Sequence, residues 1–274
     1  MTRLYYDIIK DIPVSLPLLD QDLMRSTGQN LLGLAVRTTK KPYTAIIEEI
    51  KNCSAAVVPI SSGKGVIHGF VEAVAAILQH IGLNTSVTRQ QDVAGFGEAF
   101  SSKAGILFAA DDRQFLAINV QEKAVVDNAW ATANGFVQAL AAAAEMRAEG
   151  LAGKKVLVLG LGPVGTHAVQ ALQELGAQVW VFEIDSIRIQ RCVDEHEGVQ
   201  VANDLQTAFH TIDYILDATP TAGIIDESMI RATTIVSCPG VPHGLTPAAL
   251  TKIGSRFIHD NLPLGVAVMA IQGQ

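Results

Sequence analysis

The stretch VLVLGLGPVG at 156–165 decides the fold class of this chain. Its glycines follow G-x-G-x-x-G between an apolar strand and a helix, and each has a physical task. The first permits a sharp turn, the second lets the backbone approach a pyrophosphate, and the third lets the helix pack closely on the strand. The helix start adds N–H groups and a positive dipole end. We expect the whole turn to contact a dinucleotide, through Gly160, Leu161, Gly162, Pro163, Val164 and Gly165.

An acidic residue follows these glycines at the spacing expected for a dinucleotide-binding site. Glu183 stands at the end of the second predicted strand, 178–182, about twenty residues beyond the glycines. An acid there accepts hydrogen bonds from the adenosine ribose and repels a 2′-phosphate. The next arginine, Arg188, is five residues away, so the sequence favours NAD over NADP. A solvated acid at a strand end is the simpler alternative.

Three further strands are predicted after this βαβ unit, at 214–217, 234–237 and 257–259. Together they predict a doubly wound parallel sheet of five or six strands. Open α/β sheets bind ligands at the carboxyl ends of their strands. We therefore expect the loop after the first of these strands to line the nicotinamide half, although such residues are also ordinary loop formers. The loop residues are Ala218, Thr219 and Pro220.

Short apolar runs alternate with helical patterns in the first half of the chain. This alternation favours an α/β fold with a mostly parallel sheet and helices packed on its faces. The predicted strands are 55–60, 85–88, 105–110 and 115–120, and the predicted helices are 44–52, 66–81 and 93–101.

An alanine-rich segment at 128–149 predicts a long helix that joins the two halves, because it lacks proline and holds few weak helix formers. We therefore expect three parts. An N-terminal α/β domain that shapes the substrate site covers 1–134, a connecting helix covers 135–150, and a C-terminal Rossmann-type domain covers 151–274.

Two polar clusters in the first half are candidates for substrate contact. Ser61 and Ser62 follow a strand and precede a predicted helix start, where hydroxyls and N–H groups suit a carboxylate or phosphate. A simply capped helix explains the same pattern. Asp111 and Asp112 follow another strand, where an acid can hold an ammonium or take its proton before hydride leaves the neighbouring carbon. A charged turn between strands is the alternative.

Composition excludes several classes of function. The net charge of −7 and the absence of Lys or Arg runs argue against nucleic acid or an anionic membrane as a partner. No apolar stretch has the length of a membrane span, and the N-terminus lacks a signal peptide's apolar core, so we expect a cytoplasmic protein. The three cysteines and the histidines lack the spacing of metal ligands, so we expect no metal.

Seven short sequence motifs, distributed over both halves of the chain, resemble those of the PylD family of pyrrolysine-forming dehydrogenases. The resemblance covers most of the chain, and the order of the motifs is far more specific than a single glycine motif. The motifs are ISSGKGVIHGF, DVAGFGEA, FAADDRQFLAINV, VLVLGLGPVG, DATP, SCPGVP and PLGVAVMA.

The resemblance implies an enzyme that uses NAD to oxidise L-lysine-N6-3-methyl-D-ornithine at the carbon bearing the terminal amine. Ammonia is then lost and the ring closes to pyrrolysine. It also implies a homodimer. Carried onto this chain, it places substrate polar groups near Ser61, Ser62, Asp112 and Ser237.

Two other classes stay open from the residues alone. One is another two-domain NAD(P)-dependent dehydrogenase, related to shikimate dehydrogenase or ornithine cyclodeaminase or linked to folate. The lysine–aspartate pair of shikimate dehydrogenase is not found in recognisable context, which disfavours that member. The other class is a non-catalytic NAD-binding sensor, which binds NAD but turns over no amine and tolerates neutral replacement of Asp111 or Asp112.

Overall fold

The computed structural model describes residues 4–39 and 41–273 of the chain. The chain divides into two compact units, and the main division falls between Gly135 and Phe136. Unit 2 comprises residues 136–261 together with the short segment 22–29, and unit 1 comprises the remainder, including the chain from Leu262 onward. The domain boundaries expected from the sequence differ at three places. Residues 22–29 lie in unit 2, residues 136–150 belong to unit 2 and not to a separate connecting part, and the segment from Leu262 onward lies in unit 1 and not in the Rossmann domain.

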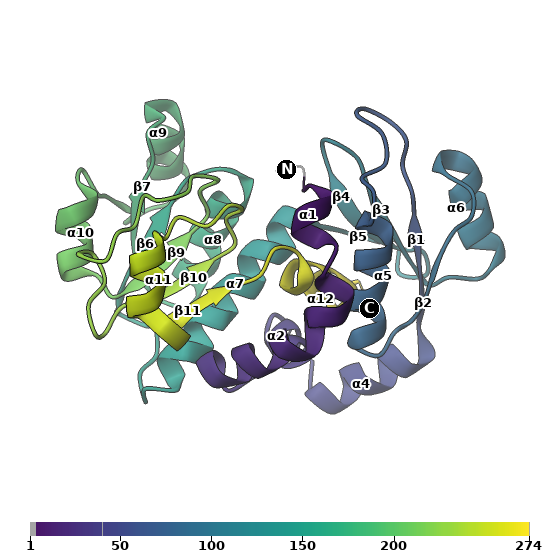
Figure 1. Cartoon of the computed structure of the whole chain (residues 1–274), viewed down its shortest axis with the longest axis horizontal. Helices are drawn as coiled ribbons and strands as arrows, with labels where there is room; N and C mark the ends of the chain where they lie inside the picture. The colour runs from purple at the N-terminus through teal and green to yellow at the C-terminus, as the bar shows by residue number, and fades with distance from the viewer. Residues whose placement is uncertain (1–3, 40, 274) are drawn as a thin grey trace. The chain divides into compact units, whose positions relative to one another are not determined.

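Unit 2 is built on a six-stranded sheet in which every neighbouring pair is parallel (Figure 1). The strand order β8-β7-β6-β9-β10-β11 is the 3-2-1-4-5-6 order of the Rossmann fold, with its switch point between β6 and β9. The Rossmann-type sheet expected from the sequence is confirmed. The strands are β6 Lys155–Leu159, β7 Gln178–Phe182, β8 Gln200–Val201, β9 Tyr214–Asp217, β10 Ile235–Cys238 and β11 Phe257–His259.

Short polar residues begin several helices of unit 2. The side chains of Asp185, Asp204 and Thr246 each accept a backbone N–H from the first turn of the helix that follows, which offsets the unpaired donors of a helix start. The helix expected after the glycine turn begins at Pro163, directly after that turn. The helices are α7 Asn128–Glu145, whose residues from Phe136 onward lie in this unit, α8 Pro163–Glu174, α9 Ser186–Glu195, α10 Leu205–Thr211, α11 Pro247–Ile253 and the 3-10 turn η1 Gly254–Arg256.

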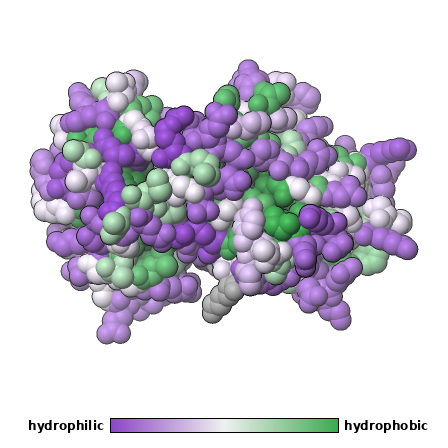
Figure 2. Space-filling model, turned by 90° about the horizontal axis from the view of Figure 1, so that it is seen from below, coloured by the Kyte–Doolittle hydropathy of each residue, from purple (hydrophilic) through white to green (hydrophobic). Residues whose placement is uncertain are grey.

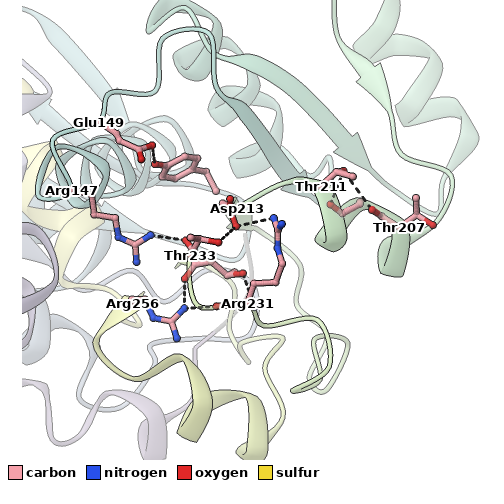
Figure 3. Close-up of polar contacts among 11 residues, drawn as sticks. Arg147, Glu149, Thr207, Thr211, Asp213, Arg231, Thr233 and Arg256 are labelled. Atoms are coloured by element: carbon pink, nitrogen blue, oxygen red, sulfur yellow. Dashed lines mark hydrogen bonds and ion pairs between the residues drawn. The ribbon is translucent and has the colours of Figure 1, made fainter.

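A polar network lies at the amino-terminal edge of this sheet (Figure 3). Arg147 donates to the carbonyl oxygen of Thr233 at 2.6 Å, and Asp213 accepts from the Thr233 hydroxyl at 2.6 Å. Asp213 also pairs with Arg231 at 2.8 Å, and Arg256 donates to the Arg231 carbonyl at 2.7 Å. These contacts satisfy carbonyl oxygens of the loop before β10 and hold that loop against the end of α7.

The sheet of unit 1 is mixed, with strand order β2-β1-β3-β4-β5 (Figure 1). β1 is parallel to β2 and β3, whereas β4 is antiparallel to β3 and β5. The expectation of a mostly parallel sheet is therefore wrong for half of the pairs. The four-residue connection 111–114 explains this, because so short a turn joins only antiparallel strands. The strands are β1 Ser54–Val58, β2 Asn84–Val87, β3 Ile106–Ala110, β4 Phe115–Asn119 and β5 Ala124–Asp127.

A helix from the far end of the sequence fills the interior of unit 1. Residues 263–271 of α12 are all buried, and this helix packs against α3, α5, β4 and β5. Gln272 secures its end by donating to the carbonyl oxygen of Thr38 at 2.7 Å. The helices are α1 Tyr6–Ile9, α2 Ile12–Thr27, whose residues 12–21 lie in this unit, α3 Leu31–Arg37, α4 Tyr43–Asn52, α5 Phe70–His80, α6 Asp92–Ser101 and α12 Pro263–Gln272.

The surface combines polar residues with scattered apolar ones. The face in Figure 2 is mainly hydrophilic, with hydrophobic residues in separate patches. Val14 and Leu18 of α2 and Val93 and Phe100 of α6 are among the exposed large apolar side chains; such scattered exposure is normal for a folded protein. Within the described part of the chain, no helix combines the length and the apolar character needed to span a bilayer.

Candidate functional site: the dinucleotide turn and an acid-rimmed hollow

The turn between β6 and α8 has the backbone that the glycine spacing predicts. Gly160 has a φ of +83°, which glycine adopts without strain. A Cβ on Gly165 would lie 1.9 Å from the Gly160 carbonyl oxygen, whereas a Cβ on Gly162 would meet no atom within 4 Å. The backbone at Gly162 is therefore open to a ligand. Because α8 starts at Pro163, the N–H groups of its first turn, which have no partner within a helix, lie beside this opening. The turn fits a diphosphate.

Glu183 is built into the same turn. Its side chain is 8% exposed; Oε2 accepts the N–H of Leu161 at 2.8 Å, and Oε1 accepts those of Ile184 and Asp185 at 2.7 and 3.1 Å. Burial raises the pKa of this carboxyl, but the three backbone donors and Arg188 outweigh that effect, so its pKa is lowered. A carboxylate offers about four lone-pair sites. Roughly one therefore stays available for a ribose hydroxyl.

Asp217 organises the loops next to the turn. It is fully buried; Oδ1 accepts the N–H and hydroxyl of Thr219 at 3.1 and 2.7 Å, and Oδ2 accepts the N–H of Gly244 at 2.9 Å and the thiol of Cys238 at 3.4 Å. Charge-assisted bonds of this kind are the stronger ones in proteins. They hold the loops after β9 and β10 together at the carboxyl edge of the sheet.

The predicted cofactor residues after β9 lie at this edge. Ala218 and Thr219 are half-buried and Pro220 is exposed. A Cβ on Gly160 would lie 3.1 Å from Cγ2 of Thr219 and 3.3 Å from the carbonyl oxygen of Ala218, so these two residues line the base of the glycine turn.

Ser237 does not lie where the resemblance places it. Its side chain is fully buried within β10, and its hydroxyl donates to the carbonyl oxygen of Phe136 at 2.8 Å. The hydroxyl thus satisfies a carbonyl of α7 rather than facing an open site. We assign Ser237 a packing role in unit 2 in place of the expected substrate contact.

Unit 1 contains a hollow at the carboxyl ends of β1 and β3. Its walls are apolar and its rim carries two carboxylates. Phe70 and Phe115 meet edge-to-face in its wall with ring centres 5.3 Å apart. A mostly apolar pocket with a few polar groups is the usual form of a small-molecule site. The lining residues are Val57, Val58, Ile60, Gly65, Val66, Ile67, Phe70, Val71, Phe108, Ala109, Ala110, Asp111, Asp112 and Phe115.

The segment 61–69 beside this hollow is a loop, and the helix expected from residue 66 begins at Phe70. Ser61 therefore caps no helix start of its own. Its N–H and hydroxyl donate to Asp92 at 2.8 and 2.5 Å, and Ser62 is exposed. Capture of an anion by these hydroxyls together with helix N–H groups, as the sequence suggested, does not fit this geometry, because the helix starts too late.

The two aspartates at the end of β3 have different surroundings. Asp111 accepts the N–H groups of Arg113 and Gln114 at 2.7 and 2.8 Å, and these bonds lower its pKa. It therefore secures the turn into β4 and is a weak base. Asp112 accepts the N–H of Lys64 at 2.7 Å and so joins the turn after β3 to the loop at 61–69.

Several residues that shape these sites escaped the sequence reasoning. Asp217 stands in the motif DATP, but its burial cannot be read from the sequence. Asp92 starts α6 and holds Ser61 from 31 residues away. Arg188 is five residues from Glu183 along the chain, yet its NH1 lies 3.8 Å from Glu183. One turn of helix after an acid is the signal that could have identified it. Within the described residues, no group of three or more metal-binding side chains comes together.

Comparison with known sequences covers both halves. Residues 9–126 match the profile of "Pyrrolysine biosynthesis protein PylD, N-terminal domain", and residues 128–240 match "S-adenosyl-L-homocysteine hydrolase, NAD binding domain". The pyrrolysine synthase of Methanosarcina acetivorans is 30% identical over 89% of this chain and 90% of its own length. The chain belongs to the PylD family. A second PylD-family relative, the pyrrolysine synthase of Methanosarcina barkeri, is 29% identical over 98% of this chain and 97% of its own length. The resemblance noted in the sequence is confirmed.

Solved structures share the fold of this PylD-family chain. Shikimate dehydrogenase from Aquifex aeolicus matches with a TM-score of 0.53 and 15% identity, over 81% of this chain and 92% of that one. Quinate dehydrogenase from Corynebacterium glutamicum, solved in complex with NAD, matches with a TM-score of 0.51 and 17% identity, over 81% and 93%. At these identities the likeness shows a dehydrogenase-like fold alone. The NAD-binding profile and the glycine turn support a nicotinamide cofactor.

Proposed function

We propose that this chain is an NAD-dependent dehydrogenase that oxidises the terminal amine carbon of L-lysine-N6-3-methyl-D-ornithine, with loss of ammonia and ring closure to pyrrolysine. The observation that carries the proposal is the relationship to a pyrrolysine synthase along nearly the whole chain, at 30% identity over 89% of it. The dinucleotide turn in unit 2 and the acid-rimmed hollow in unit 1 supply the two kinds of site that such a reaction needs.

The reaction balances without a further co-reactant. A bound nicotinamide dinucleotide supplies the acceptor for one hydride from the amine-bearing carbon. That carbon becomes an iminium, and the α-amine of the ornithine part adds to it. The original nitrogen then leaves as ammonium and the ring retains one C=N bond. The substrate thus loses one proton to the base, one hydride to the dinucleotide and one ammonium ion.

Asp112 is our candidate for the base. An ammonium cannot release hydride from its neighbouring carbon, so a proton must be removed first. Asp111 is the less suitable carboxylate, because its bonds to Arg113 and Gln114 lower its pKa. Asp112 borders a hollow with apolar walls, which suits the aliphatic stem next to an amine. Ser61 and Ser62, which are exposed in the adjoining loop, are proposed to contact polar ends of the substrate.

NAD is the proposed form of the cofactor. Glu183 lies beside the turn with a lowered pKa, so it is ionised at neutral pH and repels a 2′-phosphate.

We also propose that residues 1–134 shape the substrate site and that the protein works in the cytoplasm as a homodimer. Light scattering of the purified protein would measure that oligomeric state.

The decisive experiment incubates purified protein with NAD and the lysine-methylornithine compound. We expect absorbance of reduced cofactor to rise and mass spectrometry to find pyrrolysine and ammonium in equal amounts. Shikimate serves as the control substrate, because shikimate dehydrogenase shares the fold. A response to shikimate alone would overturn the proposal. Tight NAD binding without turnover of either compound would instead identify a sensor.

A further inference from the structure

Arg188 lies beside the acid that reads the ribose. It belongs to the first turn of α9, and that turn carries its guanidinium back to the end of β7. Its NH1 is 3.8 Å from Oε2 of Glu183, and its Nε is 3.4 Å from Oδ2 of Asp185. The side chain is 53% exposed, so both pairs are weak and easily exchanged for another anion.

The charges at this corner of unit 2 nearly cancel. Glu183 and Asp185 each contribute one negative charge and Arg188 one positive charge, which leaves a net charge of −1. A 2′-phosphate at neutral pH carries about two negative charges. It is therefore repelled by the pair of carboxylates, while the one cation within reach is engaged by them.

Two exposed apolar side chains mark the same corner. Ile184 is 92% exposed and Ile187 is 71% exposed, and both flank the end of β7 at Glu183. Single exposed apolar side chains are normal on a protein surface, so these two do not by themselves identify a binding site.

We propose that Arg188 is a specificity-determining residue whose effect depends on Glu183. While both carboxylates hold its guanidinium, the site prefers NAD. When the charge on Glu183 is removed, the guanidinium is released and binds the 2′-phosphate of NADP. This inference rests on the dinucleotide site of the proposed function and is independent of the substrate.

Conservative variants separate charge from architecture. Glu183→Gln retains one oxygen that can accept the Leu161 N–H, so the link to the glycine turn is kept, while the bonds from the N–H groups of Ile184 and Asp185 to the other oxygen are lost. Asp185→Asn retains the oxygen that accepts the Ile187 N–H at the start of α9, and Asn is a good cap. Arg188→Ala removes the guanidinium. Arg191→Ala, an exposed arginine of the same helix, is the matched control for overall charge.

The test measures dissociation constants of NADH and NADPH by fluorescence titration, with thermal unfolding to verify each fold. From wild type to Glu183→Gln we expect NADPH to bind about tenfold more tightly, and adding Asp185→Asn should extend the gain. Adding Arg188→Ala should abolish the gain, whereas adding Arg191→Ala should preserve it. Arg188→Ala alone should change NADH binding less than about threefold.

A gain in NADPH affinity that survives Arg188→Ala would overturn the inference, as would equal losses from Arg188→Ala and Arg191→Ala. Absence of any gain in Glu183→Gln would also overturn it. In these cases the wild-type protein still binds NADH, so the proposed function stands. If the wild-type protein binds neither nucleotide, the dinucleotide site itself is wrong and both proposals fall together.

Discussion

The glycine turn of unit 2 and the loop 61–69 of unit 1 both follow a strand and lead to a helix, yet they are held in different ways. The turn is defined by its backbone: Gly160 takes a positive φ, Gly165 admits a close approach, and α8 follows at once. The loop is held by distant side chains, because Asp92 and Asp112 accept its N–H groups. The geometry of a site that its own backbone holds can therefore be predicted from neighbouring residues. The geometry of a site that remote side chains hold cannot.

The largest expected effect tests whether Asp112, which holds the loop 61–69, is the base of the proposed reaction. Asp112→Asn keeps an oxygen for the Lys64 N–H but loses the charge of a base. We expect kcat for the lysine-methylornithine compound to fall by about 10²–10⁴ with NADH affinity unchanged. Asp111→Asn is the matched variant and should have a smaller effect, because that residue secures a turn. Unchanged turnover in Asp112→Asn would remove this residue from the site.

The next largest effect is expected in the glycine turn of unit 2, whose shape depends on its backbone. Gly165→Val places a side chain against the Gly160 carbonyl, where a Cβ would already lie 1.9 Å away. We expect unit 2 to lose about 3 kcal/mol of stability, measured by urea unfolding. Gly162→Ala is the control, since its Cβ meets no atom within 4 Å. It should unfold like wild type but bind NADH weakly. Equal unfolding midpoints for the two variants would contradict the close approach.

A smaller effect is expected at Asp217, because this side chain links the loops beside the glycine turn. It tests whether a side chain also supports the site that is otherwise defined by its backbone. Asp217→Asn replaces one accepting oxygen with a donor, although Thr219 and Gly244 both donate to the carboxylate. We expect a loss of about 2 kcal/mol in the unfolding free energy. Asp226→Asn, which changes a carboxylate that accepts the N–H and hydroxyl of Ser228 within its own turn, should cost less. The reverse order would show that Asp217 is not the link between these loops.

The smallest effect is a pH dependence of unit 1. Hydrogen bonds from Ser61 lower the pKa of Asp92. This contribution to stability is therefore present above the pKa of the unfolded chain and is lost as pH falls through the lower, folded pKa. In Ser61→Ala we expect the pKa of Asp92, followed by carbon-13 NMR, to rise toward its ordinary value. Ser62→Ala should leave that pKa in place, and an equal rise in both variants would contradict the assignment.

Local patterns predicted the Rossmann sheet and its nucleotide turn. The glycine spacing, the position of Glu183 at a strand end and five of the six strands of unit 2 could be predicted, because each depends on a few neighbouring residues, whereas the two-residue strand β8 was not expected. The antiparallel half of the unit 1 sheet was missed, although the short connection 111–114 was a usable signal. Helices α3 and α12 were not expected as elements, since an almost wholly apolar helix such as α12 lacks the amphipathic period that identifies helices.

Residue roles were harder to predict than elements. Ser237 lies on β10, which is buried along its whole length, and a strand buried on both faces shows no alternation that tells which side chains face a site. The place of Arg188 does not follow from its distance along the chain, because the first turn of α9 brings its guanidinium back to Glu183 and Asp185. Three positions from Asp185 to Arg188 are about one turn of α9, which is short enough for an ion pair.

The burial of α12 in unit 1 has a consequence for how the protein emerges from the ribosome. The strands of the unit 1 sheet and helices α3 and α5 are made early, but α12, which covers them, is made only after residues 136–261. At synthesis rates of about 5–20 residues per second, the nascent chain waits roughly ten seconds with that apolar interior unfinished. Until α12 leaves the ribosome, the apolar faces of α3, α5, β4 and β5 that it later covers are a binding surface for chaperones that recognise apolar segments.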